Sequence, residues 1–519
     1  MNIKFKDLLL PLGFALVITW GFQYFFINHA GNNISKETGV VSGQTFVAPQ
    51  TKQTLKPLNT EVDFFDEQRA VPVQETIVET EFARYIFSTD GGCLQSVLFK
   101  RAINGQQETI TTVAAPPENE REVRCFLLAL GEKTPYYYNL ANKKDNDETV
   151  KLAYKAETDQ ALVIKTFTIH KKTHKIDVEI GVQPKVNKSL EARLFFSAPR
   201  MLELGEYDVV SAVMNDAQGS ITRTARNSID LNQGRYTPSF FGADNRYFIH
   251  VLIDDIQGFA SRAYYKLTGK DDLFAILESS EITKQTSWKL SFYFGPKEEN
   301  AMVAVDQRLE QTLGYSGWFA FISKFLLKVL KFFYSYLRNY GLAIILLTII
   351  MRLVMFPFTI NTYEQRKKGS EYKKKLAYLQ QKYKSDPERL AQERAALIKK
   401  HGLPGIGGCL PMLLQLPVFI ALSRLLNSSF ELYHAPFFWV KDLSAKDPYY
   451  ILPFLVFFAM LIQAVTMPGN KESRLPMLGM AFVFGAIAAN FSAGLALYIF
   501  ISTSLSVFQA IVTTKMNRA

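Results

Sequence analysis

The chain has few cysteines and none of the short motifs that mark common catalytic centres. Its 519 residues include three cysteines, Cys93, Cys125 and Cys409, and none has the CxxC spacing of zinc or redox sites. The sequence also lacks GxSxG, HExxH and the phosphate-binding GxxxxGK[ST]. We therefore expect no metal and no cofactor. Cys93 and Cys125 could form a disulfide if their segment is extracytoplasmic, but a free or buried thiol is favoured over a disulfide.

Charge of both signs is scarce in long stretches of the C-terminal half. The chain is 48% hydrophobic with a mean hydropathy of +0.01, an average over a polar half, 28–310, and an apolar half after 315. The net charge of +11 could indicate nucleic-acid binding, but the basic residues are concentrated beside apolar runs. That arrangement indicates orientation in a membrane.

The N-terminus carries the first apolar run. Lys4 and Lys6 precede about twenty uncharged residues that end in an aromatic cluster. The alternatives are a signal peptide and an anchor, and since no small-x-small cleavage site follows closely, we expect an uncleaved anchor, 1–27, with a cytoplasmic N-terminus. Residues 28–80, rich in Asn, Gly, Thr, Gln and Pro, are predicted to be a flexible tether.

Apolar residues alternate with polar ones from about residue 81 to 312. Ile176, Val178 and Ile180 are separated by Asp177 and Glu179, the period of a half-buried strand. Many short strands with few helical stretches predict an all-β sandwich domain outside the membrane, in the periplasm.

We expect no catalysis from this domain. The acidic cluster Glu203, Glu206 and Asp208 could serve glycoside chemistry, but nothing in the spacing places two carboxylates across one sugar bond. His170 and His174 are interpreted as turn residues of a basic loop.

Residues 313–338 change to helical periodicity. A narrow stripe of Lys324, Lys328 and Lys331 faces a wide apolar surface, which is typical of a helix lying in the membrane interface. The alternative, a short spanning helix, would bury these lysines.

A spanning helix is predicted over 339–361, followed by a charged hairpin over 362–404. Asp386 as N-cap, Pro387 as first helical residue and Gly402 as stop signal divide the hairpin into two helices. Its twelve basic residues exceed its five acidic ones, so the positive-inside rule places it in the cytoplasm.

Four more spans complete a predicted polytopic α-helical membrane protein of six spans, with both termini in the cytoplasm. The remaining segments are span 405–426, periplasmic loop 427–448, span 449–467, cytoplasmic loop 468–475, span 476–491, span 492–513 and cytoplasmic tail 514–519. Several spans are short, which implies a locally thinned bilayer.

Arg352 lies inside the 339–361 span, where a guanidinium is costly. None of the later spans contains Asp or Glu, so Arg352 either snorkels to the interface or lies in a hydrated cavity, and the cavity is favoured. Polar residues at helical spacing support a shared groove. The predicted groove residues are Arg352, Thr348, Gln415, Gln463, Tyr498, Ser502, Ser506 and Gln509.

The segment from Trp318 to the C-terminus closely resembles the YidC family of membrane protein insertases, in its Gram-negative form. The resemblance rests on the arginine-bearing span, the charged hairpin, and the stretches Gly407–Pro411, Glu431–Leu432, Ala435–Phe437, Asp442–Pro453 and Gly494–Leu495 with Tyr498. Gly242–Phe248 and Thr89–Gly92 resemble motifs of the family's periplasmic domain.

The resemblance implies a five-helix insertase core with a hydrophilic groove, in which Arg352 attracts the acidic segment of a nascent membrane protein. It implies a bacterial inner-membrane protein that needs no nucleotide, with nascent membrane proteins, lipids, the Sec translocon and a ribosome or targeting factor as partners. In the hairpin, Lys373, Lys374, Lys375 and Lys382 are expected to recruit the ribosome or targeting factor. The alternatives are a transporter or channel with a periplasmic binding domain, and a membrane-anchored carbohydrate enzyme.

Overall fold

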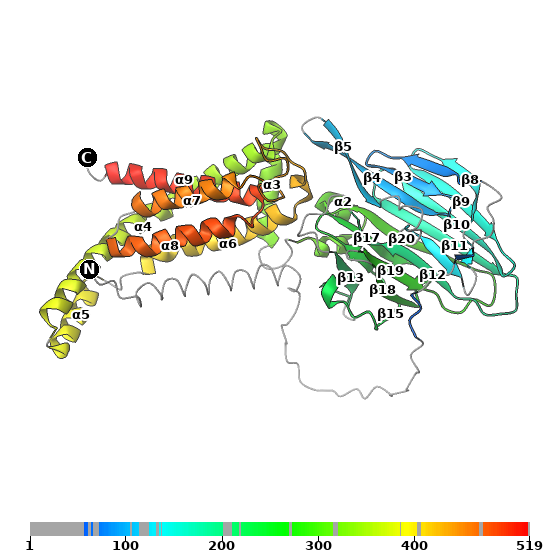
Figure 1. The fold of residues 1–519 in the computed structure, drawn as a ribbon, viewed down its shortest axis with the longest axis horizontal. Coiled ribbons are helices and arrows are strands. Elements are labelled where there is room, and N and C mark those ends of the chain that lie inside the picture. Colours follow the sequence, from blue (N-terminus) through cyan, green and yellow to red (C-terminus); the bar gives the residue numbers. More distant parts are fainter. Residues whose placement is uncertain are drawn as a thin grey trace. The chain divides into compact units, whose positions relative to one another are not determined.

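The computed structural model describes residues 57–60, 64–65, 72–103, 106–113, 124–130, 134–135, 137–200, 210–216, 219–268, 272–314, 320–384, 386–401, 406–466 and 471–516. The chain divides into two compact units. One unit is Ile27–Leu313, and the other combines Met1–Phe26 with Gly314–Ala519. The first is built from strands and the second from helices (Figure 1).

Most strands of the β unit join three antiparallel sheets. The largest has the order β14-β13-β16-β17-β20-β11-β10-β9-β8, the second β15-β18-β19-β12-β6 and the third β2-β3-β4-β5, while β1 and β7 form a short parallel pair. The strands are β1 (Phe64–Phe65), β2 (Glu75–Glu79), β3 (Ala83–Ser88), β4 (Cys93–Ile103), β5 (Gln106–Val113), β6 (Leu127–Leu130), β7 (Thr134–Pro135), β8 (Asn139–Asp145), β9 (Thr149–Glu157), β10 (Ala161–His170), β11 (Lys175–Pro184), β12 (Ala192–Ser197), β13 (Ser211–Asn215), β14 (Ile221–Ala225), β15 (Arg235–Tyr236), β16 (Phe241–Asp244), β17 (Phe248–Asp255), β18 (Arg262–Thr268), β19 (Asp272–Glu278) and β20 (Thr286–Pro296).

Aromatic side chains join the sheets face to face, which confirms the predicted sandwich. The rings of Phe196 on β12 and Phe292 on β20 are 5.4 Å apart, and those of Phe241 on β16 and Tyr265 on β18 are 4.4 Å apart. Both pairs connect the five-stranded sheet to the nine-stranded one. Burial of large aromatic rings between two sheets is the main stabilising contribution of such a core.

The predicted tether ends earlier than expected. Residues 75–79 form β2, which pairs with β3, and the side chains of Thr76 and Val78 are buried. The boundary at residue 80 was wrong because a five-residue strand with one inward threonine gives a weak alternation signal.

The two histidines predicted to be turn residues are not equivalent, since His170 is the last residue of β10 and His174 lies in the β10–β11 turn. His170 lies 2.9 Å from Asp177 through Nε2 and Oδ2, whereas the ring of His174 is buried beside Phe82, Phe99 and Tyr293. Burial lowers the pKa of His174 to about 4. The interpretation of His174 as an ordinary turn residue therefore missed a core side chain, because the inward packing depends on distant strands.

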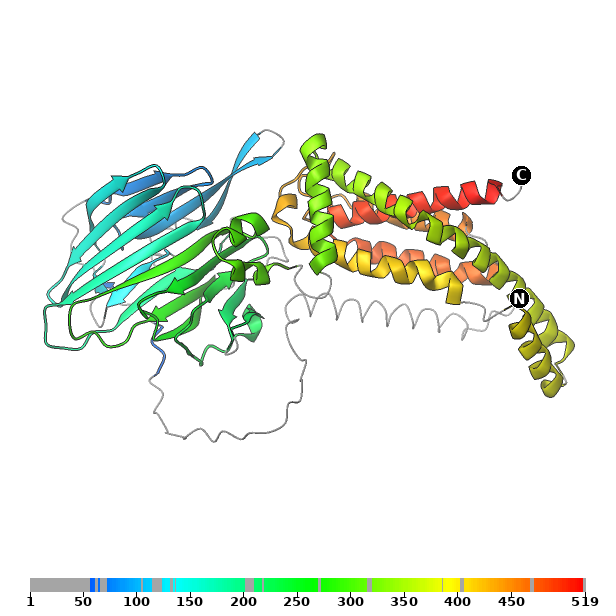
Figure 2. The same cartoon turned by 180° about the vertical axis from the view of Figure 1, so that it is seen from behind.

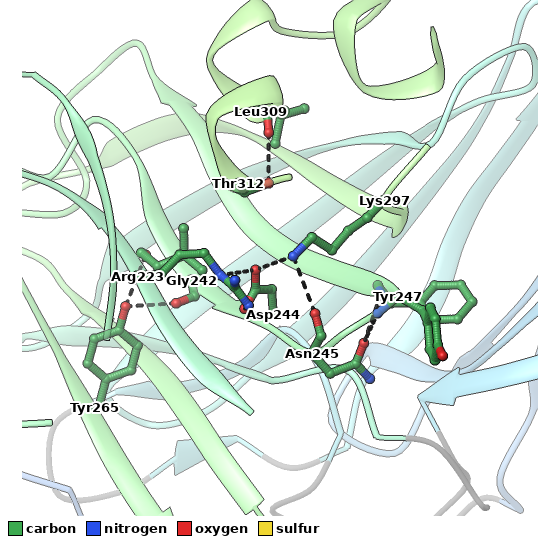
Figure 3. Close-up of polar contacts among 11 residues, drawn as sticks. Arg223, Gly242, Asp244, Asn245, Tyr247, Tyr265, Lys297, Leu309 and Thr312 are labelled. Carbon is green, nitrogen blue, oxygen red and sulfur yellow. Dashed lines mark hydrogen bonds and ion pairs between the residues drawn. The ribbon is translucent and has the colours of Figure 1, made fainter. Parts of the chain in front are cut away.

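The stretch that begins at Gly242 leads into a buried ionic cluster at the end of β16 (Figure 3). Asp244 is fully buried; its Oδ2 lies 2.7 Å from Nζ of Lys297 and 2.8 Å from Nε of Arg223. Gly242 is required because a Cβ there would lie 2.2 Å from the carbonyl oxygen of His250 on the neighbouring strand. The cluster fixes the end of β20, from which the chain continues into α2 (Glu299–Val303) and η3 (Gln307–Thr312).

Cys93 and Cys125 are free and buried. The Sγ atom of Cys125 lies 3.2 Å from Oγ of Ser197, and burial raises the pKa of the Cys125 thiol to about 12. The free thiols agree with the favoured interpretation from the sequence.

The helical unit places an amphipathic helix beside a bundle of long helices (Figure 2). Its elements are α3 (Ala320–Leu337), α4 (Tyr340–Lys382), α5 (Pro387–His401), α6 (Ile406–Ser428), η4 (Phe430–Leu432), α7 (Ile451–Thr466), α8 (Lys471–Ala488) and α9 (Ala493–Met516).

Two expected boundaries differ in this unit. The span ending at 361 and the first hairpin helix are one continuous helix, α4, because the change from apolar to charged sequence does not itself interrupt helical hydrogen bonding. The loop expected over 468–475 is shorter, since α8 begins at Lys471. The hairpin turn is as predicted at Asp386, whose Oδ1 accepts a hydrogen bond from the backbone N–H of Arg389.

Within the described ranges, the stretch Ala493–Val512 is by itself long and apolar enough to cross a membrane. Shorter apolar stretches occur at Tyr340–Phe356, Ile451–Thr466 and Met477–Ala488. The predicted anchor, 1–27, lies outside the described residues.

Candidate functional site

Three helices of the helical unit surround a narrow, partly open pocket with polar and apolar lining. The helices are α4, α6 and α9, which are far apart in the sequence. The lining side chains are Thr348, Met351, Arg352, Met355, Gln415, Val418, Tyr498 and Ser502. On α4 these residues recur at steps of three and four, so they form one face of the helix.

Arg352 reaches across the pocket to α9. Its Nε and Nη2 atoms donate to Oγ of Ser502 at 3.0 and 2.6 Å. Ser502 lies one turn after Tyr498, whose hydroxyl accepts a hydrogen bond from Nε2 of Gln415 on α6. Side-chain hydrogen bonds therefore connect α4 with α9 and α9 with α6 at the level of the pocket.

The pocket has one cation and no anion. No Asp or Glu occurs in α6, α7, α9 or the apolar part of α4. Across the part of the chain that the structure describes, no carboxylate forms an ion pair with Arg352. The guanidinium has five N–H donors, and a single hydroxyl oxygen accepts the two side-chain hydrogen bonds described above. A partly buried positive charge of this kind attracts an incoming anionic group more strongly than one in water.

Five of the eight predicted groove residues line this pocket. They are Arg352, Thr348, Gln415, Tyr498 and Ser502. Ser506 lies one turn further along α9 and donates to the carbonyl oxygen of Ser502. Gln463 on α7 and Gln509 on α9 do not line the pocket. A function for any of these residues stays a prediction.

Sequence reasoning missed the apolar part of the lining. Met351, Met355 and Val418 carry no polar group, so a search for polar residues overlooked them. The spacing of Met351 and Met355 relative to Thr348 and Arg352 was the available signal. Methionine side chains are flexible and fit varied apolar surfaces.

The cytoplasmic hairpin predicted from charge presents an exposed basic surface. Lys375 and Lys382 are exposed, and Nζ of Lys382 lies 5.2 Å from the ring centre of Tyr383. The side chains of Lys373 and Lys374 lie outside the described residues. Tyr372, on the α4 part of the hairpin, is buried.

Helix α3 has apolar side chains on both its exposed and its buried sides. Phe321, Phe325 and Tyr336 are exposed, whereas Leu326 and Leu330 are buried. The predicted basic stripe includes Lys331, but this lysine forms an ion pair at 2.6 Å with the buried Glu431. One residue of the stripe therefore holds α3 against the segment that follows α6.

The acidic cluster considered for catalysis in the β unit, Glu203, Glu206 and Asp208, lies outside the described residues.

Comparisons with known proteins agree with both units. Residues 76–329 match the family model of the YidC periplasmic domain, and residues 332–519 match that of the 60Kd inner membrane protein. The membrane protein insertase YidC of Syntrophus aciditrophicus is 30% identical over 517 residues, 92% of each chain. That of Geotalea daltonii is 28% identical over 526 residues, covering 97% of this chain and 98% of the relative.

A solved structure of an active YidC insertase with its first transmembrane domain resolved is also similar. It shares 18% identity and covers 85% of this chain and 92% of that chain, with a TM-score of 0.37. That score is too low to add to the argument. The two family models and the full-length relatives suffice: this chain belongs to the YidC family of membrane protein insertases.

Proposed function

We propose that this chain inserts nascent membrane proteins into the bacterial inner membrane, and that the pocket around Arg352 receives the polar segment of the substrate. The observation that carries the proposal is the pairing of a partly buried guanidinium with a hydroxyl group instead of a carboxylate. Since the helices around it supply no anion, an acidic stretch of substrate would be the counter-charge. Apolar side chains such as Met351 and Met355 would contact the adjoining hydrophobic segment.

We further propose a six-span arrangement with both termini in the cytoplasm, the β unit in the periplasm and the hairpin in the cytoplasm. The supports are the positive charge of the hairpin and the apolar stretches of α4, α6, α7, α8 and α9. In this arrangement the exposed lysines of the hairpin would contact a ribosome or targeting factor, and the Sec translocon would be a partner of some reactions. The insertion step itself would use no nucleotide and make no covalent intermediate.

The test is insertion by the purified full chain in liposomes, without ATP or other proteins, of a small substrate with an acidic translocated tail. We expect Arg352→Ala to reduce insertion about tenfold, equivalent to about 1.4 kcal/mol, and Arg352→Lys to reduce it less. Arg424→Ala is the matched control, because Arg424 is a second arginine of an apolar helix and does not line the pocket. Equal loss in Arg352→Ala and Arg424→Ala would contradict the assignment of the pocket.

A substrate whose tail has Asn and Gln in place of Asp and Glu separates charge attraction from geometry. If charge attraction is the mechanism, Arg352→Ala should change insertion of this neutral substrate much less.

A transporter or channel would instead show flux of small solutes that depends on the pocket, with no insertion activity.

A further inference from the structure

The outer face of the five-stranded sheet carries a row of charges across three neighbouring strands. Arg193 on β12 is directly opposite Glu278 on β19, which is directly opposite Arg262 on β18. Each of the three is at least nine-tenths buried. Nη2 of Arg262 lies 2.8 and 2.9 Å from the two carboxylate oxygens of Glu278. The row is therefore organised by contacts within the sheet.

The residues two positions further along the same strands form an apolar row on the same face. Phe195, Ile276 and Tyr264 lie beside the charge row, and Leu127 of β6, which is opposite Phe195, extends the apolar row. Alternation along a strand requires these side chains to share a face. A charged row and an apolar row thus run side by side across the sheet.

A four-residue piece of the N-terminal segment, 57–60, lies on this face. The carbonyl oxygen of Asn59 accepts from Nη1 of Arg193 at 2.8 Å and lies 2.7 Å from the hydroxyl of Tyr264. The carbonyl oxygen of Pro57 is 3.4 Å from Nη2 of Arg262. Between them, Leu58 packs against the apolar row.

These contacts are of the kind by which proteins bind extended peptides. The two arginines and the tyrosine donate to main-chain carbonyl oxygens, which every peptide has, and the apolar row contacts one leucine side chain. The segment itself is lightly held, because Pro57 and Asn59 are exposed and Leu58 and Thr60 are only partly buried. A preorganised set of donors beneath a segment that is largely exposed favours exchange of that segment.

We propose that the face formed by Arg193, Arg262, Glu278 and Tyr264 is a binding site for an extended, unfolded polypeptide segment with a leucine-sized side chain. Residues 57–60 occupy it in cis and act as an internal competitor. The inference is independent of the Arg352 pocket, since it rests on contacts within the β unit alone.

The experiment measures binding of a fluorescent peptide with the sequence of residues 54–63 to the full chain in detergent micelles, by fluorescence anisotropy. A tethered segment competes at an effective concentration of about 1 mM, so the unaltered protein should bind the probe weakly. Leu58→Asp, which places a charge against the apolar row, should release the segment and tighten probe binding by about tenfold or more. Adding Tyr264→Phe should then weaken binding about fivefold, as expected for one lost hydrogen bond.

Three outcomes would overturn the proposal. These are no saturable binding to a folded Leu58→Asp protein, equal binding to the unaltered and Leu58→Asp proteins, and equal binding of a probe in which the leucine at the position of Leu58 is aspartate. Folding is checked by the thermal melting of each variant. If Leu58→Asp does not fold, replacement of residues 57–60 by Gly-Ser-Gly-Ser releases the segment without a buried charge.

Discussion

The two units bury cations in opposite ways. In the β unit, Lys297 is 3% exposed and contacts Asp244 at 2.7 Å, and the fully buried Lys165 donates to the carbonyl oxygens of Gly91 and Phe126 at 2.6 and 3.0 Å. In the helical unit, Arg352 remains partly exposed in a pocket and donates to the hydroxyl of Ser502.

The two units thus use a buried cation for two purposes. In the β unit the cation stabilises the fold, and in the helical unit we propose that it acts on a ligand. In a buried ion pair each charge is neutralised by its partner within the fold. Removing one partner leaves the other charge buried and unpaired, which lowers the free energy of unfolding. Burial still lowers the pKa of Lys297 to about 8 and that of Lys165 to about 7. Arg352 has no carboxylate partner among the described residues, and under the proposed function an acidic segment of the substrate would supply one.

The largest expected effect is in the β unit. Asp244→Ala removes the carboxylate between Lys297 and Arg223 and leaves a buried lysine beside a partly buried arginine with no anion between them. We expect the free energy of unfolding to fall by about 3–5 kcal/mol, measured by urea denaturation and far-ultraviolet circular dichroism. The control is Glu79→Gln, which breaks exposed ion pairs with Arg84 and Lys100 and should leave stability unchanged. An equal loss in both variants would contradict the comparison.

The free energy of unfolding should depend on pH because the β unit buries two histidines in their neutral form. Burial lowers the pKa of His174 to about 4 and that of His250 to about 3, against about 6.5 in an unfolded chain. Between these values the unfolded state binds more protons, so stability falls as pH falls from about 6.5. We expect a loss of about 1.6 kcal/mol per histidine between pH 6.5 and 5.

His174→Leu isolates one of these contributions, since the ring has mostly aromatic neighbours and its Nδ1 has no hydrogen-bond partner among the described residues. Urea denaturation of this variant at pH 6.5 and pH 5 should show about half the loss seen in the unaltered protein. An unchanged pH slope would mean that His174 does not titrate in this window.

The smallest effect on stability is expected at Arg352. Arg352→Met removes a cation without leaving a buried carboxylate unpaired, and the freed Ser502 hydroxyl can turn toward the helix backbone. We expect a change of about 1 kcal/mol or less in the free energy of unfolding, together with a clear loss of insertion. Stability loss as large as that of Asp244→Ala would mean that Arg352 is a structural charge as well.

Local signals in the sequence predicted the helical unit well. The Asp386-Pro387 cap is confirmed because capping depends on neighbouring residues. The shared face of Thr348 and Arg352 on α4, and that of Tyr498 and Ser502 on α9, follow from helical spacing, and the structure places all four around one pocket.

Contacts between distant segments could not be predicted in the same way. Lys331 forms an ion pair with Glu431, a hundred residues away, although its spacing fits an exposed stripe. Leu58 packs on strands that come more than sixty residues later, and nothing in a polar, proline-containing segment indicates that contact. The burial of His174 likewise depends on rings of β20 and of the residues around β3 and β4.

The uninterrupted helix α4 has a mechanical consequence. About thirty residues separate Arg352 from Lys382, which is about 45 Å at 1.5 Å per residue. Helix α4 therefore contributes to the pocket near its N-terminal end and to the basic hairpin at its C-terminal end. A partner that tilts the hairpin would thus pull on the wall of the pocket through covalent and hydrogen-bonded backbone, without any intervening joint between domains.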